Sequence, residues 1–519
     1  MENRISRFRL FSIFTFMKKK SSNSKSGTAK ESLTSGKEQA KGWWGEGPVF
    51  VFLYNKQKKE AITNGDAEEI LQFVKDSEHT LHESEALRVI RIDNEYSHPI
   101  LFVDTGKETG LDPLDHLRMA GYRLAKWAEN KAIKTLMIPP LKKDSEEKRY
   151  AILQGLCHAS YTFDKYKSKK SKKADIEYLF ADNMEIDGNS LQALFSGIDL
   201  AKNLINEPGS ALTPAVMANI AQNIAQKYGL TIKIRKSKEL EKDGYNGILT
   251  VGRGSKNEPA MVTLSYKPKQ KNITHLAFVG KGITFDTGGI CLKPQDKMYE
   301  MKSDMSGSAI VLAAIQIIAE LKLPIEVDAI LCLAENRPGE NAVLPGDIFK
   351  AKNGKTVMVE NTDAEGRLVL IDGLMEAAEL GATHVIDIAT LTGAIRRALG
   401  TSIGGLFSNS EGLAQTLMET GAENGEKWWR MPLDEEYAEG LKDKTADIRN
   451  IADDGPGAII AAMFLKEFVK EDLQWAHLDI AGVDFTAKGY KYTEYGATAF
   501  GLKTLVETAK KYSTEEIRC

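Results

Sequence analysis

The sequence predicts an α/β protein: a smaller N-terminal α/β domain, a long connecting helix, and a larger C-terminal α/β domain with a mostly parallel central sheet. Three observations support this fold class. Short apolar runs typical of strands alternate with segments of helical spacing along the chain. An amphipathic helix at residues 189–206 ends at Glu207-Pro208-Gly209. Beyond it, two apolar runs lead into charged loops, as strands do at their carboxyl ends in α/β proteins.

The composition is that of an ordinary soluble globular protein. The chain has 519 residues, with 42% hydrophobic and 27% charged residues, and this length suits two to four domains at about 150 residues each. The net charge is −3, from 69 basic and 72 acidic residues, so no overall field favours nucleic acid or membrane. The four cysteines are scattered without a CxxC pair, which argues against disulfides and thiolate zinc sites and favours a reducing compartment.

Residues 1–42 are predicted to be a disordered extension. Residues 18–41 are rich in Ser, Lys and Gly, and such a segment buries too little apolar surface to offset the entropy of ordering it. The apolar run in residues 1–16 is too short and interrupted to span a bilayer, and no signal-peptide cleavage site follows it. A transit peptide or surface-binding helix remains an alternative, as does translation from Met17.

Residues 43–188 are predicted to form the N-terminal α/β domain. Residues 165–173 hold six lysines and no acid; they are interpreted as a solvated loop, with an anion or nucleic-acid patch as the alternative. The expected strands are residues 48–53, 87–92, 100–104 and 135–138, and the expected helices are residues 67–74, 112–130 and 146–159.

Residues 207–519 are predicted to form the catalytic domain, entered through the helix at 189–206. A helix starts at Thr213-Pro214, where Thr can cap and Pro suits the first helical position. Strands alternating with helices imply a largely parallel sheet covered on both faces. The expected strands are residues 231–234, 247–251, 261–266, 276–279, 327–333, 356–360, 385–389, 404–407 and 475–480, and the expected helices are 306–321, 365–380, 412–420, 458–471 and 497–511.

The first charged loop is NTDAEGRL (residues 361–368), which follows an apolar run and precedes a segment of helical spacing. Asp363 and Glu365 have one residue between them, so an extended loop would point both carboxylates the same way. Two such charges repel each other unless a cation, a shared proton or a basic partner lies between them. An alternative stays open here: Asp363 could cap the following helix, with Glu365 in its first turn.

The second charged loop begins with GKGITFDTGG (residues 280–289) after the apolar run 276–279. Its opening Gly-Lys-Gly suggests a phosphate-binding loop, but the GxxxxGK[ST] spacing is absent. Lys281 and Asp286 lie within it, and Lys293 and Asp304 follow. Taken singly, Asp304 is a candidate helix cap and Lys293 an ordinary loop lysine.

If the strands before the two loops are neighbours in the sheet, the charged residues of both loops lie close together. Four carboxylates and two or three cations would then meet at its carboxyl edge. A buried cluster of this kind is costly unless metal ions occupy it. Oxygen ligands without Cys or His suit Mg, Mn or Zn, and do not choose among them.

On these motifs the chain resembles the leucyl aminopeptidase (cytosol aminopeptidase) family of two-metal exopeptidases. The blocks GKGITFDTGG and NTDAEGRL carry the resemblance, supported by NEPGSALTP (206–214), DIATLTGA (387–394) and WAHLDIAG (475–482). It is close over residues 189–512, and in the N-terminal domain extends only to size and α/β pattern. Two departures, at residues 305–308 and 334–339, touch no ligand position and bear on substrate preference.

The resemblance implies a metal site with five ligands. Asp286 and Glu365 would bridge two divalent ions, manganese or zinc, with Asp363 completing the more exchangeable site and Lys281 with Asp304 the tighter one. Lysine ligates only as the neutral amine, so its pKa would have to fall well below about 10.4. The metals would lower the pKa of a bridging water, bind the substrate's α-amine and polarise the scissile carbonyl.

The resemblance also implies the remaining roles. Lys293 would stabilise the charge of the gem-diolate, and Arg367 would hold a bicarbonate ion as the proton shuttle. The expected activity is removal of N-terminal residues, leucine and other apolar residues favoured, from peptide substrates by a cytoplasmic homohexamer. The residues expected around the first substrate side chain and backbone are Met301, Thr390, Leu391 and Gly393.

Two competing functions are retained. A nucleic-acid-binding or structural role rests only on the lysine run 165–173, and the net charge of −3 speaks against it. A metal-dependent phosphatase or nucleotide hydrolase could use the same cluster. No membrane partner is expected, because no apolar run is long enough to span a bilayer.

Overall fold

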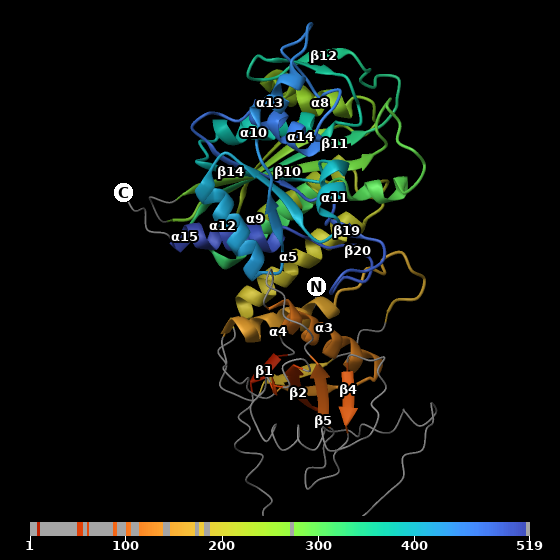
Figure 1. Ribbon diagram of the computed structural model, residues 1–519, viewed down its shortest axis with the longest axis vertical. Helices are drawn as coiled ribbons and strands as arrows, with labels where there is room; N and C mark the ends of the chain where they lie inside the picture. Colours follow the sequence, from red (N-terminus) through yellow and green to blue (C-terminus); the bar gives the residue numbers. More distant parts are fainter. Residues whose placement is uncertain are drawn as a thin grey trace, which may run out of the picture. The chain divides into compact units, whose positions relative to one another are not determined.

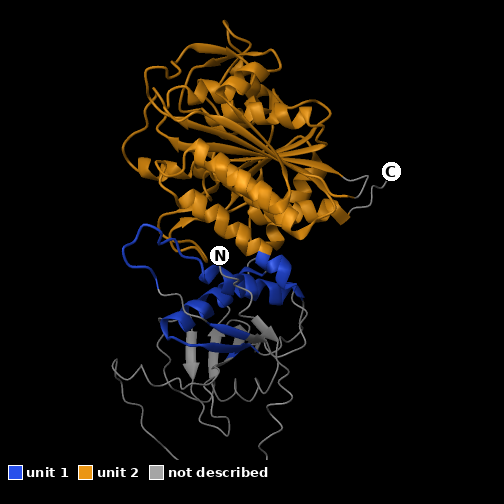
Figure 2. Ribbon diagram, turned by 180° about the vertical axis from the view of Figure 1, so that it is seen from behind, with its two compact units in different colours: residues 1–192 blue, residues 193–519 orange. Residues whose placement is uncertain are grey.

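The computed structural model divides the chain into two compact units, Met1–Gln192 and Ala193–Cys519 (Figure 2). The division falls within helix α5 (Gly188–Asn206), which covers the predicted connecting helix. Each unit has its own sheet, as expected for two α/β domains. The structure describes residues 8–10, 49–55, 60–61, 87–90, 100–104, 114–138, 146–171, 176–180, 187–269 and 274–514.

The N-terminal unit is built on a seven-stranded sheet of order β1-β7-β6-β2-β5-β4, with β3 paired to β2. Its helices α3 and α4 pack closely through two glycines: a Cβ on Gly121 would lie 2.3 Å from the Ile152 carbonyl oxygen, and one on Gly155 2.0 Å from that of Arg118. The elements are β1 (Phe8–Leu10), β2 (Val49–Asn55), β3 (Glu60–Ala61), β4 (Leu87–Ile90), β5 (Ile100–Asp104), α3 (Asp115–Asn130), β6 (Thr135–Ile138), α4 (Glu146–Ala159) and β7 (Glu177–Phe180).

Several predictions for this unit concern segments that the structure describes only in part. Within the predicted extension 1–42, only Phe8–Leu10 is described, as strand β1 parallel to β7. The predicted helix at 67–74 lies outside the described residues. Of the lysine run, residues 165–171 lie in exposed turns, in which the Lys170 ammonium donates to the carbonyls of Asp164 and Lys165.

The C-terminal unit is organised around an eight-stranded mixed sheet of order β16-β15-β18-β14-β10-β11-β9-β8. Its four central strands, β18, β14, β10 and β11, run parallel, and the antiparallel pairings lie toward the edges. The strands of this sheet are β8 (Thr231–Lys236), β9 (Ala260–Tyr266), β10 (His275–Asp286), β11 (Glu326–Asn336), β14 (His384–Ala389), β15 (Gly404–Ser408), β16 (Trp428–Arg430) and β18 (Gln474–Asp479).

Helices cover both faces of this sheet (Figure 1). Helix α9 crosses one face with α15 and α6 against it, and α10 crosses the other with α8 and α14. The helices are α6 (Pro214–Tyr228), α7 (Ser237–Asp243), α8 (Asn246–Gly252), η2 (Met298–Ser303), α9 (Ser306–Leu321), α10 (Gly366–Glu379), α11 (Gly393–Leu399), α12 (Glu411–Glu423), α13 (Glu435–Ala438), η3 (Glu439–Leu441), α14 (Gly457–Lys466) and α15 (Leu502–Thr514).

Two small sheets complete the unit. One has the order β12-β13-β17, with β12 (Asp347–Lys350), β13 (Thr356–Val359) and β17 (Ile448–Arg449). The other pairs β19 (Phe485–Thr486) with β20 (Gly496–Ala497). Strand β13 is the run that precedes NTDAEGRL, so this charged loop does not follow a strand of the central sheet.

The predicted strand at residues 247–251 is wrong, because this segment is helix α8. Short apolar runs do not distinguish a strand from a buried helix by periodicity. Packing decides here: a Cβ on Gly247 would lie 2.0 Å from the Leu368 carbonyl oxygen, so α8 lies directly on α10. The buried Asp372 carboxylate of α10 accepts a hydrogen bond of 2.8 Å from the Ile248 amide, which satisfies the start of α8.

The Gly-Lys-Gly sequence of β10 has a packing function. A Cβ on Gly280 would lie 2.6 Å from the backbone of Ser308 in α9, and one on Gly307 would lie 2.0 Å from the Ile388 carbonyl oxygen of β14. The Ser308 hydroxyl donates to the Gly280 carbonyl at 2.8 Å. These glycines therefore let the start of α9 touch the sheet backbone beside Lys281.

One stretch among the described residues, Met298–Leu321, is long and apolar enough on composition to cross a membrane. It comprises η2 and α9, and 89% of its apolar window is buried inside the protein. This burial is that of a core helix covering a sheet.

Replacing Gly307 by Ala tests the close approach of α9 to the sheet. The added Cβ collides with backbone that cannot rotate away, so we expect a loss of about 1–3 kcal/mol in unfolding free energy and a lower melting temperature. The control is Gly412→Ala in α12, where a Cβ meets nothing within 4 Å and Ala favours the helix. Equal melting temperatures for the two variants in differential scanning fluorimetry would contradict the packing role.

Candidate metal centre

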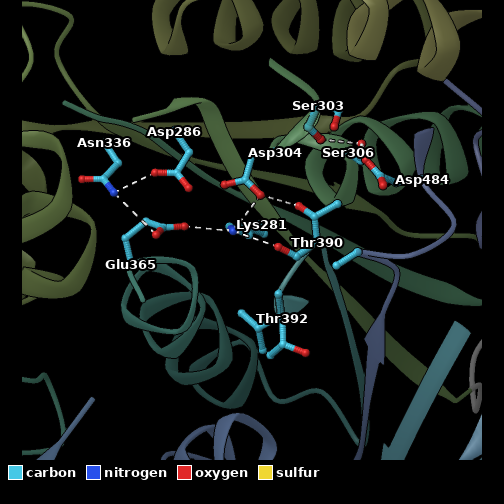
Figure 3. Close-up of polar contacts among 12 residues, drawn as sticks. Lys281, Asp286, Ser303, Asp304, Ser306, Asn336, Glu365, Thr390, Thr392 and Asp484 are labelled. Carbon is cyan, nitrogen blue, oxygen red and sulfur yellow. Dashed lines mark hydrogen bonds and ion pairs between the residues drawn. The ribbon is translucent and has the colours of Figure 1, made fainter. Parts of the chain in front are cut away.

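The candidate centre lies where β10 ends and α10 begins (Figure 3). Strand β10 supplies Lys281 and Asp286, Asp304 follows η2, and Glu365 lies immediately before α10. Figure 3 shows the carboxyl groups of Asp286, Asp304 and Glu365 turned toward the Lys281 amine. These four side chains are buried, each with at most 7% of the residue exposed.

The two charged loops meet although their strands are not neighbours. Since β13 belongs to the small sheet, the expected adjacency of the two strands is wrong, and other contacts join the loops. Asn336 at the end of β11 donates hydrogen bonds to the Asp286 carboxylate, at 2.8 Å, and to the Thr362 carbonyl, at 2.9 Å. The Thr362 hydroxyl donates 2.6 Å to the Gly288 carbonyl. The side chain of Asn336 thus bridges the two halves of the centre.

Lys281 stands between three acceptors at short range. Its ammonium lies 2.8 Å from Asp304 Oδ1, 2.9 Å from Glu365 Oε1 and 2.9 Å from the Thr390 carbonyl oxygen. Burial acts to lower the pKa of Lys281, but the surrounding carboxylates outweigh it and raise that pKa above its ordinary value. In this charge state Lys281 is the counter-ion of the cluster.

Lys293 makes the second cationic contact. Its ammonium lies 2.8 Å from Asp286 Oδ2 and contacts Asp363. Burial opposes its protonation, yet the negative charges of Asp286 and Glu365 raise the pKa of Lys293. Its side chain is 21% exposed, against 3% for Lys281, so it reaches the centre from the open side.

The carboxylates are not helix caps. Asp363 lies in a turn, and its backbone amide donates a hydrogen bond of 2.8 Å to the Asn361 side chain. Glu365 occupies the position before α10 but makes no side-chain capping bond. Helix α9 begins after Met305, again with no side-chain cap, while Asp304 accepts 2.6 Å from the Thr390 hydroxyl. The capping alternatives are therefore excluded, and these charges face the centre.

The donor set fits divalent metal ions. One carboxylate oxygen from each of Asp286, Asp363 and Glu365 lies within 4.8 Å of the others. Within the described part of the chain, the buried Oδ2 of Asp304 has no hydrogen-bond partner. Burial and repulsion from neighbouring carboxylates raise the pKa of Asp286, Asp304 and Asp363. The carboxylates repel each other when ionised, and a cation bound among them removes this repulsion. Oxygen ligands of this kind suit Mg, Mn or Zn.

Arg367 places a further cation beside the carboxylates. Its guanidinium donates to the Asn450 carbonyl at 2.6 Å, while Nε is buried without a hydrogen-bond partner in the described part of the chain. Burial lowers the pKa of Arg367 to about 10, so it stays cationic at neutral pH. A fixed guanidinium with a free donor suits a small anion.

A single cavity of about 620 Å³ unites the predicted residues. Besides the charged residues, its lining includes residues of η2, of the segment after β14 and of the start of α11. The structure places all eleven predicted site residues on its lining: Lys281, Asp286, Lys293, Met301, Asp304, Asp363, Glu365, Arg367, Thr390, Leu391 and Gly393.

Comparison with known proteins agrees with this geometry. Residues 199–506 match the model of the cytosol aminopeptidase family, catalytic domain, and residues 49–170 match that of the family's N-terminal domain. The chain belongs to the cytosol aminopeptidase family. It therefore falls among aminopeptidases, which are hydrolases.

Relatives cover most of the chain. A probable cytosol aminopeptidase of Aquifex aeolicus is 37% identical over 472 residues, covering 90% of this chain and 96% of that protein. One of Chlorobaculum tepidum is 42% identical over 388 residues, covering 72% of this chain and 77% of its own. Among solved structures, the bottromycin maturation enzyme BotP is 30% identical, with a TM-score of 0.78, over 90% of this chain and 99% of its own.

Three residues that support this aminopeptidase centre were not predicted from the sequence. They are Asn336, Asn450 and Asp479, and all are buried. Asn450 lies after β17, and its side chain accepts from the amides of Glu360 and Asn361 and donates to the Asn361 carbonyl at 2.7 Å. It thus fixes the loop that carries the acidic residues. A polar residue directly after a short strand was the only available signal.

Asp479 at the end of β18 fixes the segment that follows β14. Its carboxylate accepts from the Leu391 amide at 3.1 Å and from the Thr392 hydroxyl at 2.7 Å. The Thr392 hydroxyl in turn accepts from Ile395 and caps α11. The backbone whose Thr390 carbonyl binds Lys281 is therefore held from the neighbouring strand.

Replacing Asn450 by Ala tests the support of the acidic loop. Two half-buried amides and a carbonyl lose their partner, so we expect metal affinity and kcat/KM each to fall at least about tenfold. The control is Asn409→Ala, which also removes side-chain bonds to backbone, to Leu473 and Trp475, but at the opposite end of β18. Metal titration and kinetics that do not distinguish the two variants would contradict this role.

Proposed function

We propose that this chain is a two-metal-dependent aminopeptidase that removes the N-terminal residue from peptides. The observation that carries the proposal is the convergence of four carboxylates and two lysines on one cavity at the end of β10. Four crowded carboxylates, three of them buried, require cations for charge balance, and the two lysines with Arg367 leave one carboxylate charge unbalanced. A similar solved structure, that of BotP in complex with Mn, supports manganese, and zinc fits the same donors.

The ligand assignment is the one that the family resemblance implies, and the contacts of the side chains support it. Asp286, Asp304, Asp363 and Glu365, with Lys281 as a neutral amine, would hold the ions. Lys281 contacts Asp304 and Glu365 on the buried side, and Lys293 contacts Asp286 and Asp363 on the more exposed side. When bound, the ions would lower the pKa of a water molecule and polarise the scissile carbonyl. The remaining steps belong to the side chains of the protein.

The two lysines would have different roles. Lys281 can contribute a lone pair only when neutral, and its raised pKa reflects the charge of Asp304 and Glu365, which bound cations would neutralise. Lys293 reaches the cavity from its exposed side and would stay charged, donating to the oxygen that becomes negative as the carbonyl is attacked.

Arg367 would hold a bicarbonate ion through its free Nε donor. A bicarbonate held there would supply the proton-transferring group, because no histidine lines the cavity. Met301, Thr390, Leu391 and Gly393 would surround the first residue of the substrate. Leucine and other apolar residues are the preference implied by family resemblance.

We also propose a homohexamer in the cytoplasm, on family resemblance alone. Light scattering of the purified protein tests the assembly, and a monomer would overturn it.

A substrate screen combined with one variant tests the activity. With added Mn, the protein should hydrolyse leucine p-nitroanilide and leave p-nitrophenyl phosphate intact; the reverse result would favour the phosphatase alternative. Glu365→Ala should lose both metal and activity while remaining folded, because Glu365 joins both halves of the centre. Glu379→Ala, at the exposed far end of the same helix, is the control. Normal metal content in Glu365→Ala would refute the site.

Two lysine variants separate ligation from charge stabilisation. Lys281→Arg should weaken one metal site, because Arg stays charged and cannot ligate. Lys293→Ala should keep both metals and lose turnover by a factor on the order of 10²–10³. Metal analysis and steady-state kinetics decide. The roles are reversed if Lys293→Ala loses metal and Lys281→Arg keeps metal and full activity.

A further inference from the structure

A buried carboxylate that the proposed chemistry does not use lines the same cavity. Asp484 follows β18 and is 6% exposed. Its main chain is fixed, because its amide donates to Ile480 and its carbonyl accepts 2.9 Å from the Thr498 amide. The side chain therefore holds a defined position on the cavity wall, beside Ser303 and Ser306 (Figure 3).

Asp484 lines the cavity together with residues proposed to contact the first substrate side chain. Met301 and Ser303 of η2, Thr390, Gly393 and Phe485 share this lining. On the proposed function, the first side chain of the substrate would therefore come near Asp484. Its carboxylate accepts hydrogen bonds from the hydroxyls of Ser303 and, at 3.3 Å, Ser306.

The charge of Asp484 lacks a direct cationic partner. Within the described residues, no lysine or arginine nitrogen lies within 4.0 Å of its carboxylate, although Arg396 on the exposed rim attracts it from farther away. Burial raises the pKa of Asp484 to about 7 against that attraction and the two serine bonds. A second buried acid, Glu300, lines the same cavity. The cavity thus has two buried acids, Asp484 and Glu300, besides the metal-binding carboxylates, while the cations Lys297, Arg396 and Arg397 of its lining are exposed to solvent.

We infer that Asp484 is a specificity-determining residue that selects N-terminal residues whose side chain ends in a cation, namely lysine and arginine. The inference rests on the proposed aminopeptidase function, and it replaces the apolar preference implied by family resemblance with a cationic substrate class. An ammonium or guanidinium brought to this wall gains a charged hydrogen bond in a partly dry cavity, where such bonds are strongest. An apolar tip instead leaves the buried carboxylate with its serine hydrogen bonds but without a cationic partner.

A purely structural role makes a different prediction. Asp484 lies at the start of α9, where a carboxylate stabilises the positive end of a helix. Asn in its place still accepts the serine hydrogen bonds but carries no charge. A structural role would change all substrates alike, whereas selection by charge changes only the ratio between them.

The experiment compares lysine and norleucine coumarylamides, since norleucine is the lysine side chain without its ammonium group. We expect the wild-type protein with Mn to show a kcat/KM for lysine about tenfold or more above that for norleucine. Asp484→Asn should lower this ratio about tenfold, and arginine against norleucine should behave the same way. The control Asp296→Asn removes one exposed acid from the rim, and its ratio should stay within about twofold, because solvent screens that charge.

Each contrary result has one meaning. A wild-type preference for norleucine overturns the role of Asp484 whether or not the variant folds. A ratio unchanged in Asp484→Asn, or equal losses for both substrates, overturns it as well and leaves aminopeptidase activity standing. A wild-type protein that hydrolyses neither of these substrates nor leucine p-nitroanilide refutes the proposed function itself.

Discussion

The charge balance at the carboxyl end of β10 constrains the rest of the C-terminal unit. Asp286, Asp304 and Glu365 are nearly inaccessible to water, and carboxylates in such a place are destabilising unless cations face them. Lys281, which is buried, and Lys293, which is partly exposed, compensate part of this negative charge. The carboxylates that remain in excess are the physical reason for assigning metal ions to this cavity.

Such a cluster demands a rigid surround, and the polar residues beneath it supply one. Asn336, Asn450 and Asp479 come from the ends of β11, β17 and β18, and each binds backbone of a loop that carries a site residue. Their own side chains are buried and hydrogen-bonded, so a shift in any of these loops would break a buried hydrogen bond. The metal-binding side chains are thus oriented by residues that do not reach the ions.

Close backbone contact brings these loops together. Gly280 and Gly307 allow α9 to touch the sheet beside Lys281. On the other face, a Cβ on Gly366 would lie 2.5 Å from Lys281 Cε and 2.8 Å from its ammonium nitrogen, so α10 begins directly against the Lys281 side chain. The cavity that results has a metal-binding side and a substrate side with its own charge, Asp484. Both α9 and α10 begin against the strand that carries Lys281, and this packing forms the metal-binding side and the substrate side of the cavity together.

The sequence by itself determined the α/β class, the connecting helix and the residues of the centre. The fold class followed from apolar runs that alternate with helical segments, and the residues of the centre followed from the resemblance carried by GKGITFDTGG and NTDAEGRL, which concentrate charge that a core does not tolerate. Only the tertiary structure decided that residues 247–251 are helical, that β13 lies outside the central sheet, and that Asn450 and Asp484 face the site. These features depend on contacts between residues about 80 to 180 positions apart, such as Asn450 with Asn361 and Asp484 with Ser306, and local sequence pattern carries no record of such contacts.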